Sequence, residues 1–311
     1  MNKLIVILGP TSSGKSSLAI KLARKFSGEI ISVDSRQVYK GMDLGTGKVP
    51  ISHFLRSKKS AKSSTPAKAG IYSGGVRHHL LDIASPKKQF TVSDFKRLAF
   101  RSVEQIQRQN KIPFLVGGSP FYIYSVIDNL QIPEVKPNLK LRKQLAKKSL
   151  AELFRMLKRF DPKRAKNIDK NNPRRLIRAI EIVKATGRPV PHPSPLNPQP
   201  CLILGIKKAP EELKKLIKIR LESRLKQGMV SEVKKLLKAG VSHKRLFELG
   251  LEYRYISEYI LGKLTYQKMK EQLFRAIIKF SKRQMTWFKR DSRIQWIKNS
   301  KQAEKLIKKF F

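Results

Sequence analysis

Residues 9–16 read GPTSSGKS, and they follow the short apolar run Leu4–Leu8. They match the pattern G-x-x-x-x-G-K-[ST], in which glycines allow consecutive backbone N–H groups to point at one anion. A helical pattern follows at Lys15–Phe26, so the order is strand, glycine-rich turn and helix. This order predicts a phosphate-binding loop, with Lys15 facing the terminal phosphates and the Ser16 hydroxyl placed to hold Mg²⁺. The residues expected to contact the phosphates are Gly9, Pro10, Thr11, Ser12, Ser13, Gly14, Lys15 and Ser16.

On both sides of this loop, short apolar runs alternate with helical patterns, which is typical of a parallel α/β sheet. We expect helices at Lys15–Phe26 and at Val92–Gln109, the second capped by Thr91 or Ser93. The expected strands are Leu4–Leu8, Glu29–Val33, His79–Ile83, Pro113–Val116 and Leu202–Ile206. The predicted fold is a P-loop NTPase-like parallel sheet core with an inserted helical subdomain and a helical C-terminal region.

Proline-rich segments indicate how the chain is divided. Gln131–Pro137 is a linker into a helical block, and the five prolines of Pro191–Pro200 forbid a continuing helix after it. We expect the first part of the core at residues 1–130, the helical insertion at 131–199, and core completion with C-terminal helices at 200–311. The longest of these helices is expected at Tyr266–Lys289. The Ser- and Lys-rich stretch Ser52–Gly75 predicts a mobile basic loop.

Composition indicates the partner and the compartment. The chain has 68 Lys and Arg against 22 Asp and Glu, a net charge of +46, which attracts polyanions and makes their binding salt-dependent. The alternative is a lysine-rich proteome, with most of these charges on solvated faces. One cysteine, Cys201, rules out an internal disulfide framework and fits a reducing cytoplasm. No apolar run approaches the roughly 18 residues that span a bilayer, so we expect no membrane partner.

A carboxylate and a hydroxyl are expected beside the phosphate loop, because ligands of an open parallel sheet bind at the carboxyl ends of its strands. Asp34 follows the strand Glu29–Val33, and Ser119 follows Pro113–Val116 and two glycines. Asp34 can coordinate Mg²⁺, act as a general base or cap the following turn. Ser119 can reach Asp34 or a phosphate oxygen, and it can also cap the next helix.

Basic side chains gather on two predicted helical segments. Arg275, Lys279, Lys282 and Arg283 share one face of the long C-terminal helix, with Trp287 one turn beyond them. Cations beside an aromatic suit a phosphate backbone with unstacked bases, although Trp287 can equally be a core residue. Arg174, Arg175 and Arg178 form a second cluster on the insertion, so the pattern favours a groove for a folded nucleic acid. The pair His78-His79 predicts no zinc site, because strand neighbours point to opposite faces.

Taken together, these segments resemble the tRNA dimethylallyltransferase (tRNA isopentenyltransferase) family, in the family's order and over nearly the whole chain. The matching segments are GPTSSGKS (9–16), DSRQVY (34–39), GMDLGTG (41–47), HHLLDI (78–83), VGGS (116–119), NPRRLIRAIE (172–181), GLEYR (250–254) and KRQMTWF (282–288). The resemblance implies transfer of a dimethylallyl group from its diphosphate to N6 of the adenosine 3′-adjacent to the anticodon, in tRNAs that read codons beginning with U. It further implies Mg²⁺ as cofactor, the tRNA anticodon stem-loop as partner and a monomer.

The resemblance also implies roles for individual residues. Asp34 is the base, Lys15 assists at the diphosphate, and Ser119 stands where the family usually has threonine. The residues matching tRNA contacts are Asp34, Ser35, Arg36, Gln37, Ser119, Arg142, Arg174, Arg175, Arg178, Arg254, Lys282, Arg283 and Trp287.

Two other functions remain open. A P-loop kinase would use ATP to phosphorylate a small molecule or an RNA end, and it too can place an acidic residue after its second strand. The basic clusters argue against a small acceptor. A non-catalytic RNA-binding protein with a nucleotide switch would not need a carboxylate and a hydroxyl beside the phosphates.

Overall fold

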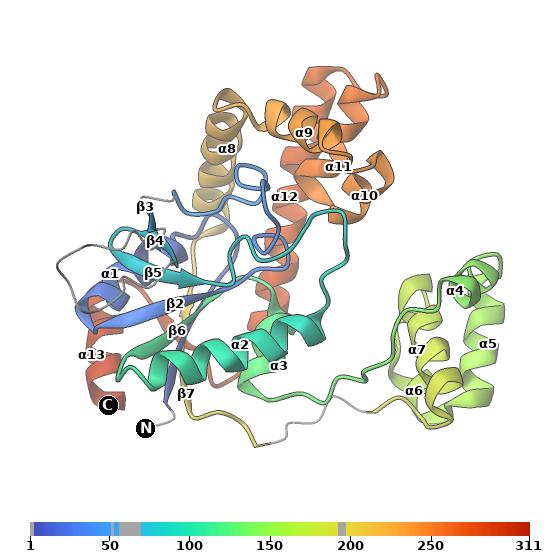
Figure 1. Cartoon of the computed structure of the whole chain (residues 1–311), viewed down its shortest axis with the longest axis horizontal. Helices are drawn as coiled ribbons and strands as arrows, with labels where there is room; N and C mark the ends of the chain where they lie inside the picture. The colour runs from blue at the N-terminus through green and yellow to red at the C-terminus, as the bar shows by residue number, and fades with distance from the viewer. Residues whose placement is uncertain (1–2, 51–52, 56–69, 192–196) are drawn as a thin grey trace, which may run out of the picture. The chain divides into compact units, whose positions relative to one another are not determined.

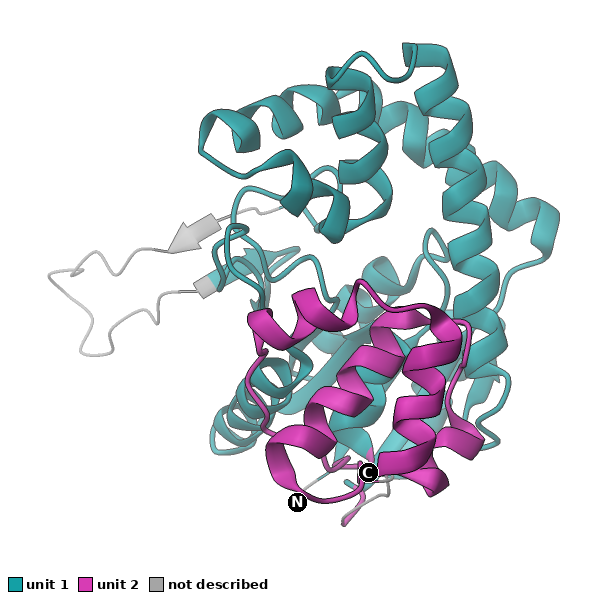
Figure 2. Cartoon of the chain, turned by 90° about the vertical axis from the view of Figure 1, so that its right-hand side faces the viewer, with its two compact units in different colours: residues 1–127, 199–311 teal, residues 128–198 magenta. Residues whose placement is uncertain are grey.

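The structure is a computed structural model that describes residues 3–50, 53–55, 70–191 and 197–311. The chain divides into two compact units (Figure 2). Unit 1 combines residues 1–127 with 199–311, and unit 2 is residues 128–198, where the sequence predicts an insertion at 131–199. No described helix is both long enough and apolar enough to cross a membrane.

Unit 1 is built on a sheet in which the described residues form eight strands, in the order β3-β4-β5-β2-β6-β1-β7-β8 (Figure 1). Pairing is parallel from β5 to β8, while β3, β4 and β5 pair antiparallel at one edge. The central strands are almost completely buried because helices cover both faces of a parallel sheet. The strands are β1 (Leu4–Leu8), β2 (Gly28–Val33), β3 (His53–Leu55), β4 (Gly70–Ser73), β5 (Val76–His79), β6 (Ile112–Gly117), β7 (Cys201–Ile206) and β8 (Gln295–Ile297).

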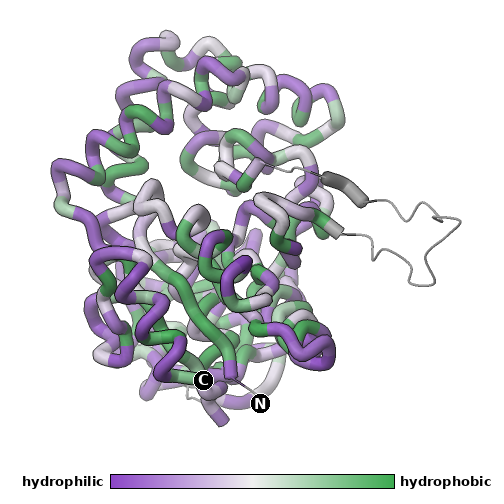
Figure 3. Tube along the Cα trace, turned by 90° about the vertical axis from the view of Figure 1, so that its left-hand side faces the viewer, coloured by the Kyte–Doolittle hydropathy of each residue, from purple (hydrophilic) through white to green (hydrophobic). Residues whose placement is uncertain are grey.

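Two pairs of helices cover the sheet. On one face α1 (Lys15–Lys25) and α13 (Ser300–Phe310) share a core with strand residues, and on the other α2 (Val92–Gln107) and α3 (Pro120–Ile127) do so. Figure 3 shows hydrophobic colour running along strands of the sheet, while the helices alternate between the two colours, as amphipathic helices do. The predicted parallel α/β class is therefore confirmed.

The C-terminal part of unit 1 is helical, as predicted, and has a core of its own. This core includes Tyr39 and Met42 from the segment after β2, so the helices pack on the loop that leaves the sheet. The helices are α8 (Pro210–Lys226), α9 (Met229–Lys238), α10 (His243–Leu249), α11 (Leu251–Ile260) and α12 (Tyr266–Phe288).

Unit 2 is a small helical body with a separate apolar core that includes Leu153, Leu157 and Leu176. Its helix starts follow local capping chemistry: Ser149 and Glu152 form a reciprocal capping box, and the Asn172 side chain accepts from the N–H of Arg175. The helices are α4 (Leu139–Leu145), α5 (Leu150–Phe160), α6 (Pro162–Asn167) and α7 (Pro173–Thr186).

Some sequence predictions were wrong. The strand expected at His79–Ile83 ends at His79, because Leu80 (φ 63°) and Asp82 (φ 53°) are left-handed and cannot continue an extended strand. The loop expected at Ser52–Gly75 contains β3 and β4; its residues 56–69 lie outside the described residues, as do 192–196 of the proline-rich segment.

Strand β8 was not predicted, because its three residues carry too little pattern. The other predicted strands and the three helices predicted with bounds are confirmed within two residues at each end, and Thr91, not Ser93, caps α2.

Candidate active site

The phosphate loop adopts the backbone that an anion cradle needs. Ser12 (φ 62°) and Gly14 (φ 87°) are left-handed, which turns successive N–H groups inward between β1 and α1. A side chain at Gly9 would come within 2.9 Å of the Ile206 carbonyl oxygen, so the loop must start with glycine. Lys15 Nζ donates to the Pro10 carbonyl at 3.1 Å and lies folded back over the loop.

A cavity of about 230 Å³ opens beside this loop, entirely within unit 1. It brings the predicted residues Lys15, Ser16, Asp34 and Ser119 into one site, from the carboxyl ends of β1, β2 and β6. The remaining predicted residues that line it are Thr11, Ser35, Arg36 and Gln37. The sheet topology explains this gathering, since β1, β6 and β2 are adjacent and parallel.

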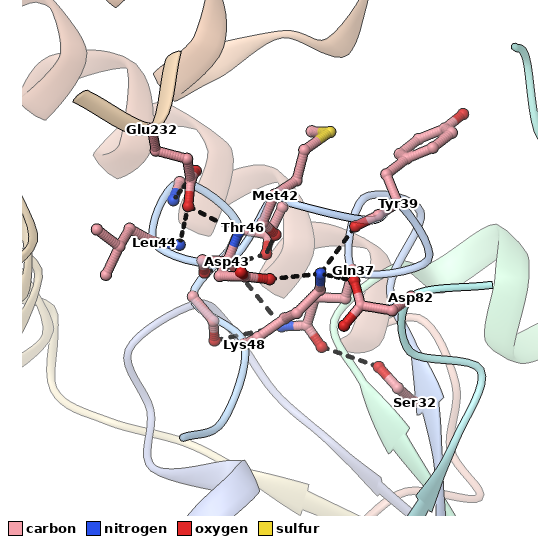
Figure 4. A network of polar contacts seen from close by, with 12 residues as sticks. Ser32, Gln37, Tyr39, Met42, Asp43, Leu44, Thr46, Lys48, Asp82 and Glu232 are labelled. Atoms are coloured by element: carbon pink, nitrogen blue, oxygen red, sulfur yellow. Dashed lines mark hydrogen bonds and ion pairs between the residues drawn. The ribbon is translucent and has the colours of Figure 1, made fainter. Parts of the chain in front are cut away.

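The Asp34 carboxylate is oriented by the turn that it caps. Its Oδ1 accepts from the N–H groups of Arg36 (2.8 Å) and Gln37 (3.4 Å), so the capping alternative is confirmed without removing Asp34 from the cavity. Gln37 is itself held: it accepts from the Ser32 hydroxyl at 2.9 Å and donates to the carbonyl oxygens of Thr46 and Gly47, both at 3.3 Å (Figure 4).

Two arginines of α8 line the cavity and were missed by the sequence reasoning. Arg220 donates to the Gly47 carbonyl at 3.1 Å, and buried Arg224 lies 3.3 Å from the Glu252 carboxylate. Their spacing of four residues on one helix face was a readable signal, hidden among many other Lys and Arg. Glycine at position 47 suits its left-handed backbone (φ 63°), and a Cβ there would come within 1.9 Å of Arg224 Nη2 and so displace this guanidinium group.

Burial and crowding of like charges perturb the titration of these groups. Burial, with Arg220 nearby, lowers the pKa of Lys15 to about 8. Burial, with Arg224 nearby, lowers the pKa of Arg220 to about 10. Burial raises the pKa of Glu252 despite the neighbouring Arg224. Cations gathered tightly enough to disfavour their own charge form a strong site for a multiply charged anion.

Gln284 of α12 was also missed, although the motif that contains it was noticed. Its Oε1 accepts from the Thr11 N–H at 2.9 Å, and its Nε2 donates to the Gly118 carbonyl at 2.6 Å. The side chain is only 4% exposed. Gln284 therefore joins the phosphate loop to the segment that carries Ser119.

The opposite face of α12 carries the predicted basic residues at the surface. Arg275, Lys279, Lys282 and Arg283 are all exposed, as the helical spacing predicts. Trp287 is 43% exposed, so the alternative of a core tryptophan is wrong; the neighbouring Phe288 fills that position. Arg254 is exposed on α11, with its guanidinium 5.9 Å from the centre of the Phe247 ring.

In unit 2 the predicted arginines separate into two kinds. Arg174 and Arg175 are exposed at the start of α7. Arg142 and Arg178 both bind the buried carboxylate of Glu181, at 2.7 Å and 2.6 Å, and keep about a third of their surface exposed. These two therefore have a structural contact that the sequence reasoning did not foresee.

The two neighbouring histidines have unrelated surroundings. His79 lies 2.6 Å from Glu29, which also binds Lys111, whereas the buried Nε2 of His78 finds no hydrogen-bond partner among the residues that the structure describes. Burial lowers the pKa of His78 to about 4, with the His79 charge adding to it. Among the described residues, no group of three or more His, Cys, Asp and Glu side chains could hold a metal ion.

Comparisons with known proteins agree on one family. A family model described as IPP transferase matches residues 37–291. The chain is 38% identical over 302 residues to tRNA dimethylallyltransferase 1 of Syntrophus aciditrophicus, covering 96% of this chain and 94% of that protein.

Solved structures are similar as well. The full-length tRNA isopentenylpyrophosphate transferase of Bacillus halodurans matches with a TM-score of 0.67 and 30% identity, covering 100% of this chain and 95% of that one. A eukaryotic dimethylallyltransferase described as acting on tRNA matches with a TM-score of 0.72 and 26% identity, covering 92% and 69%.

Proposed function

The chain belongs to the IPP transferase family, and on that premise we propose that it transfers a dimethylallyl group from dimethylallyl diphosphate to tRNA. The acceptor is N6 of the adenosine 3′-adjacent to the anticodon, in tRNAs that read codons beginning with U. One observation carries this proposal: a phosphate loop, two arginines, a carboxylate and a hydroxyl line the same cavity.

The phosphate loop and its cations would bind the diphosphate. As the bond between the allylic carbon and the diphosphate oxygen breaks, its electron pair leaves with the diphosphate. Lys15, Arg220 and Arg224 would stabilise that growing charge better in the transition state than in the bound donor. The Ser16 hydroxyl lies in the first turn of α1 and lines the cavity, and a hydroxyl oxygen is a ligand of the kind that suits Mg²⁺, so Ser16 fits the ion. Bound there, Mg²⁺ would neutralise part of the diphosphate charge.

Asp34 would act at the other reacting atom. The N6 amine is a weak nucleophile, because its lone pair is delocalised into the purine ring. It forms the new N–C bond as its proton passes to the Asp34 carboxylate, which the N–H groups of Arg36 and Gln37 already orient. Ser119 would position the amine from the neighbouring strand end. The adenosine must leave its stack to reach the cavity, which costs less in a single-stranded loop.

The tRNA would be held by the exposed basic surfaces. On α12 these are Lys282 and Arg283 with Trp287 beside them, and on α7 they are Arg174 and Arg175. Phosphate contacts of this kind position an RNA and dominate its affinity. The working form is proposed to be a monomer, as the family resemblance implies, in the cytoplasm, where a chain with a single cysteine fits the reducing conditions.

A transfer assay with two labels tests the proposal. One reaction contains labelled dimethylallyl diphosphate, Mg²⁺ and unmodified tRNA with adenosine 3′ to the anticodon; the other contains γ-labelled ATP instead. Prenyl label in RNA that is lost when this adenosine is replaced by guanosine supports the proposal. Phosphate label in RNA without prenyl label would overturn it in favour of a kinase.

A further inference from the structure

A carboxylate outside the cavity gathers the backbone of the loop that forms one cavity wall. Glu232, in the first turn of α9, accepts from three consecutive N–H groups: those of Asp43 (2.8 Å), Leu44 (2.7 Å) and Gly45 (3.0 Å). Figure 4 shows Glu232 above this loop with hydrogen bonds running down to it. Successive N–H groups that converge on one point form an anion site, and here the chain's own carboxylate fills it.

A second contact fixes the carboxylate itself. The hydroxyl of Tyr253 donates to Glu232 Oε1 at 2.8 Å, and the tyrosine is only 1% exposed. Its ring packs directly against the loop, where a Cβ on Gly45 would come within 2.6 Å of it. Glu232 is thus held between the buried Tyr253 side chain and the loop at residues 43–45, which packs tightly against the Tyr253 ring.

The carbonyl oxygens of the same loop accept hydrogen bonds from the two arginines that line the cavity. The Gly45 carbonyl accepts from Arg224 Nη1 at 3.4 Å, and the Gly47 carbonyl accepts from Arg220 Nη2 at 3.1 Å. Because both guanidinium groups rest on carbonyl oxygens of this loop, a shift of the loop would shift them. Glu232 is not among the side chains that line the cavity in the described part of the chain.

We propose that Glu232 is a positioning residue for donor binding: by holding the loop 43–47 it places Arg220 and Arg224 for the diphosphate. This inference rests on the function proposed above and deepens it. Glu232 touches no reacting atom. Its carboxylate occupies an anion site of the backbone, so that the neighbouring cations remain available to the anion of the substrate.

The test is Glu232→Gln in the full chain, with Glu222→Gln as the matched control. Glutamine keeps the volume but removes the charge and replaces one of the two accepting oxygens with an NH₂ group, so part of this set of N–H and O–H donors loses its acceptor. Glu222 is a surface carboxylate of α8 whose ion-pair partner within the described part of the chain is Lys270, at 3.1 Å, and it lies outside the cavity lining. Titration of dimethylallyl diphosphate in Mg²⁺ without tRNA gives the donor Kd, and a filter assay gives the tRNA Kd.

For Glu232→Gln we expect the donor Kd to rise about tenfold to a hundredfold, the range for losing hydrogen bonds to a charged group, with the tRNA Kd unchanged. The control should leave both constants unchanged. A folded Glu232→Gln protein with an unaltered donor Kd overturns the inference, as does an equal loss of donor and tRNA binding.

If Glu232→Gln does not fold, Glu232→Asp replaces it. Its shorter carboxylate should still raise the donor Kd several-fold, and a Kd within twofold of the parent protein overturns the inference. Failure of the parent protein to transfer dimethylallyl would count against the proposed function instead, so the two failures are distinguishable.

Discussion

Raising the pH from 7 to 9 should weaken binding of dimethylallyl diphosphate about tenfold, because Lys15 is the cation of the phosphate loop and titrates near pH 8 in the free protein. A bound diphosphate favours the protonated amine and moves its pKa back toward the ordinary 10.5. Affinity is therefore full below pH 8 and is lost as the pH rises through it. The difference between a Lys15 pKa of about 8 and the ordinary 10.5 limits the contribution of this proton linkage to the binding free energy to about 3 kcal/mol.

Calorimetric titration of the donor at constant Mg²⁺, without tRNA, measures the effect. The second ionisation of a phosphate group lies near pH 6, so the ligand itself takes up no proton above pH 8. At pH 8 binding should take up about half a proton, seen as a difference in heat between two buffers of unequal ionisation enthalpy. Lys15→Arg is the matched control, since a guanidinium keeps its charge throughout this range. A Kd that stays within twofold from pH 7 to pH 9 in the parent protein, with equal heats in both buffers, would refute the reasoning.

Three further predictions concern other residues. Asp34→Asn should keep the tRNA Kd but lower the single-turnover rate about 10²–10⁴-fold, the usual contribution of a general base, and a near-normal rate would contradict that role. Arg283→Ala should weaken tRNA binding and reduce the slope of log K against log salt by about one, whereas an unchanged slope means that this helix face does not meet phosphate. His78 takes its proton near pH 4 when folded and near 6.5 when unfolded, so stability falls as the pH falls through this window. Between pH 7 and pH 5 the unfolding free energy of His78→Gln should therefore fall by about 2 kcal/mol less than that of the parent protein, as measured by urea denaturation. Equal losses in both proteins would exclude this cause.

Local patterns were sufficient for elements that carry their own signal. The strand at Leu4–Leu8 and the helix that starts at Lys15 were predicted correctly, because a buried parallel strand is continuously apolar and a glycine-rich turn separates it from the helix. The strand expected at His79–Ile83 failed because Leu80 and Asp82 fill left-handed turn positions instead.

The candidate site could be predicted only in part. Asp34 and Ser119 were found because a sequence rule places the carboxyl ends of parallel strands at one edge of the sheet. No such rule predicts Arg220, Glu232 and Gln284. They lie on helices that come a hundred residues or more later in the chain than Ser119, and only the fold brings them to the cavity or to the loop that forms its wall. In a chain with 68 Lys and Arg, one arginine does not stand out by type.

The sequence by itself determined the family resemblance, the phosphate loop and the parallel α/β core, because each depends on residues that are neighbours in the chain. Only the tertiary structure decided which side chains complete the cavity and which cations are already engaged. Arg142 and Arg178 are paired with Glu181 in unit 2, while Arg220 and Arg224 line the cavity of unit 1, where Arg224 is also paired with Glu252. The physical reason is that the environment of a charge depends on partners distant in sequence, and helical spacing shows which residues share a face but not which partners meet that face.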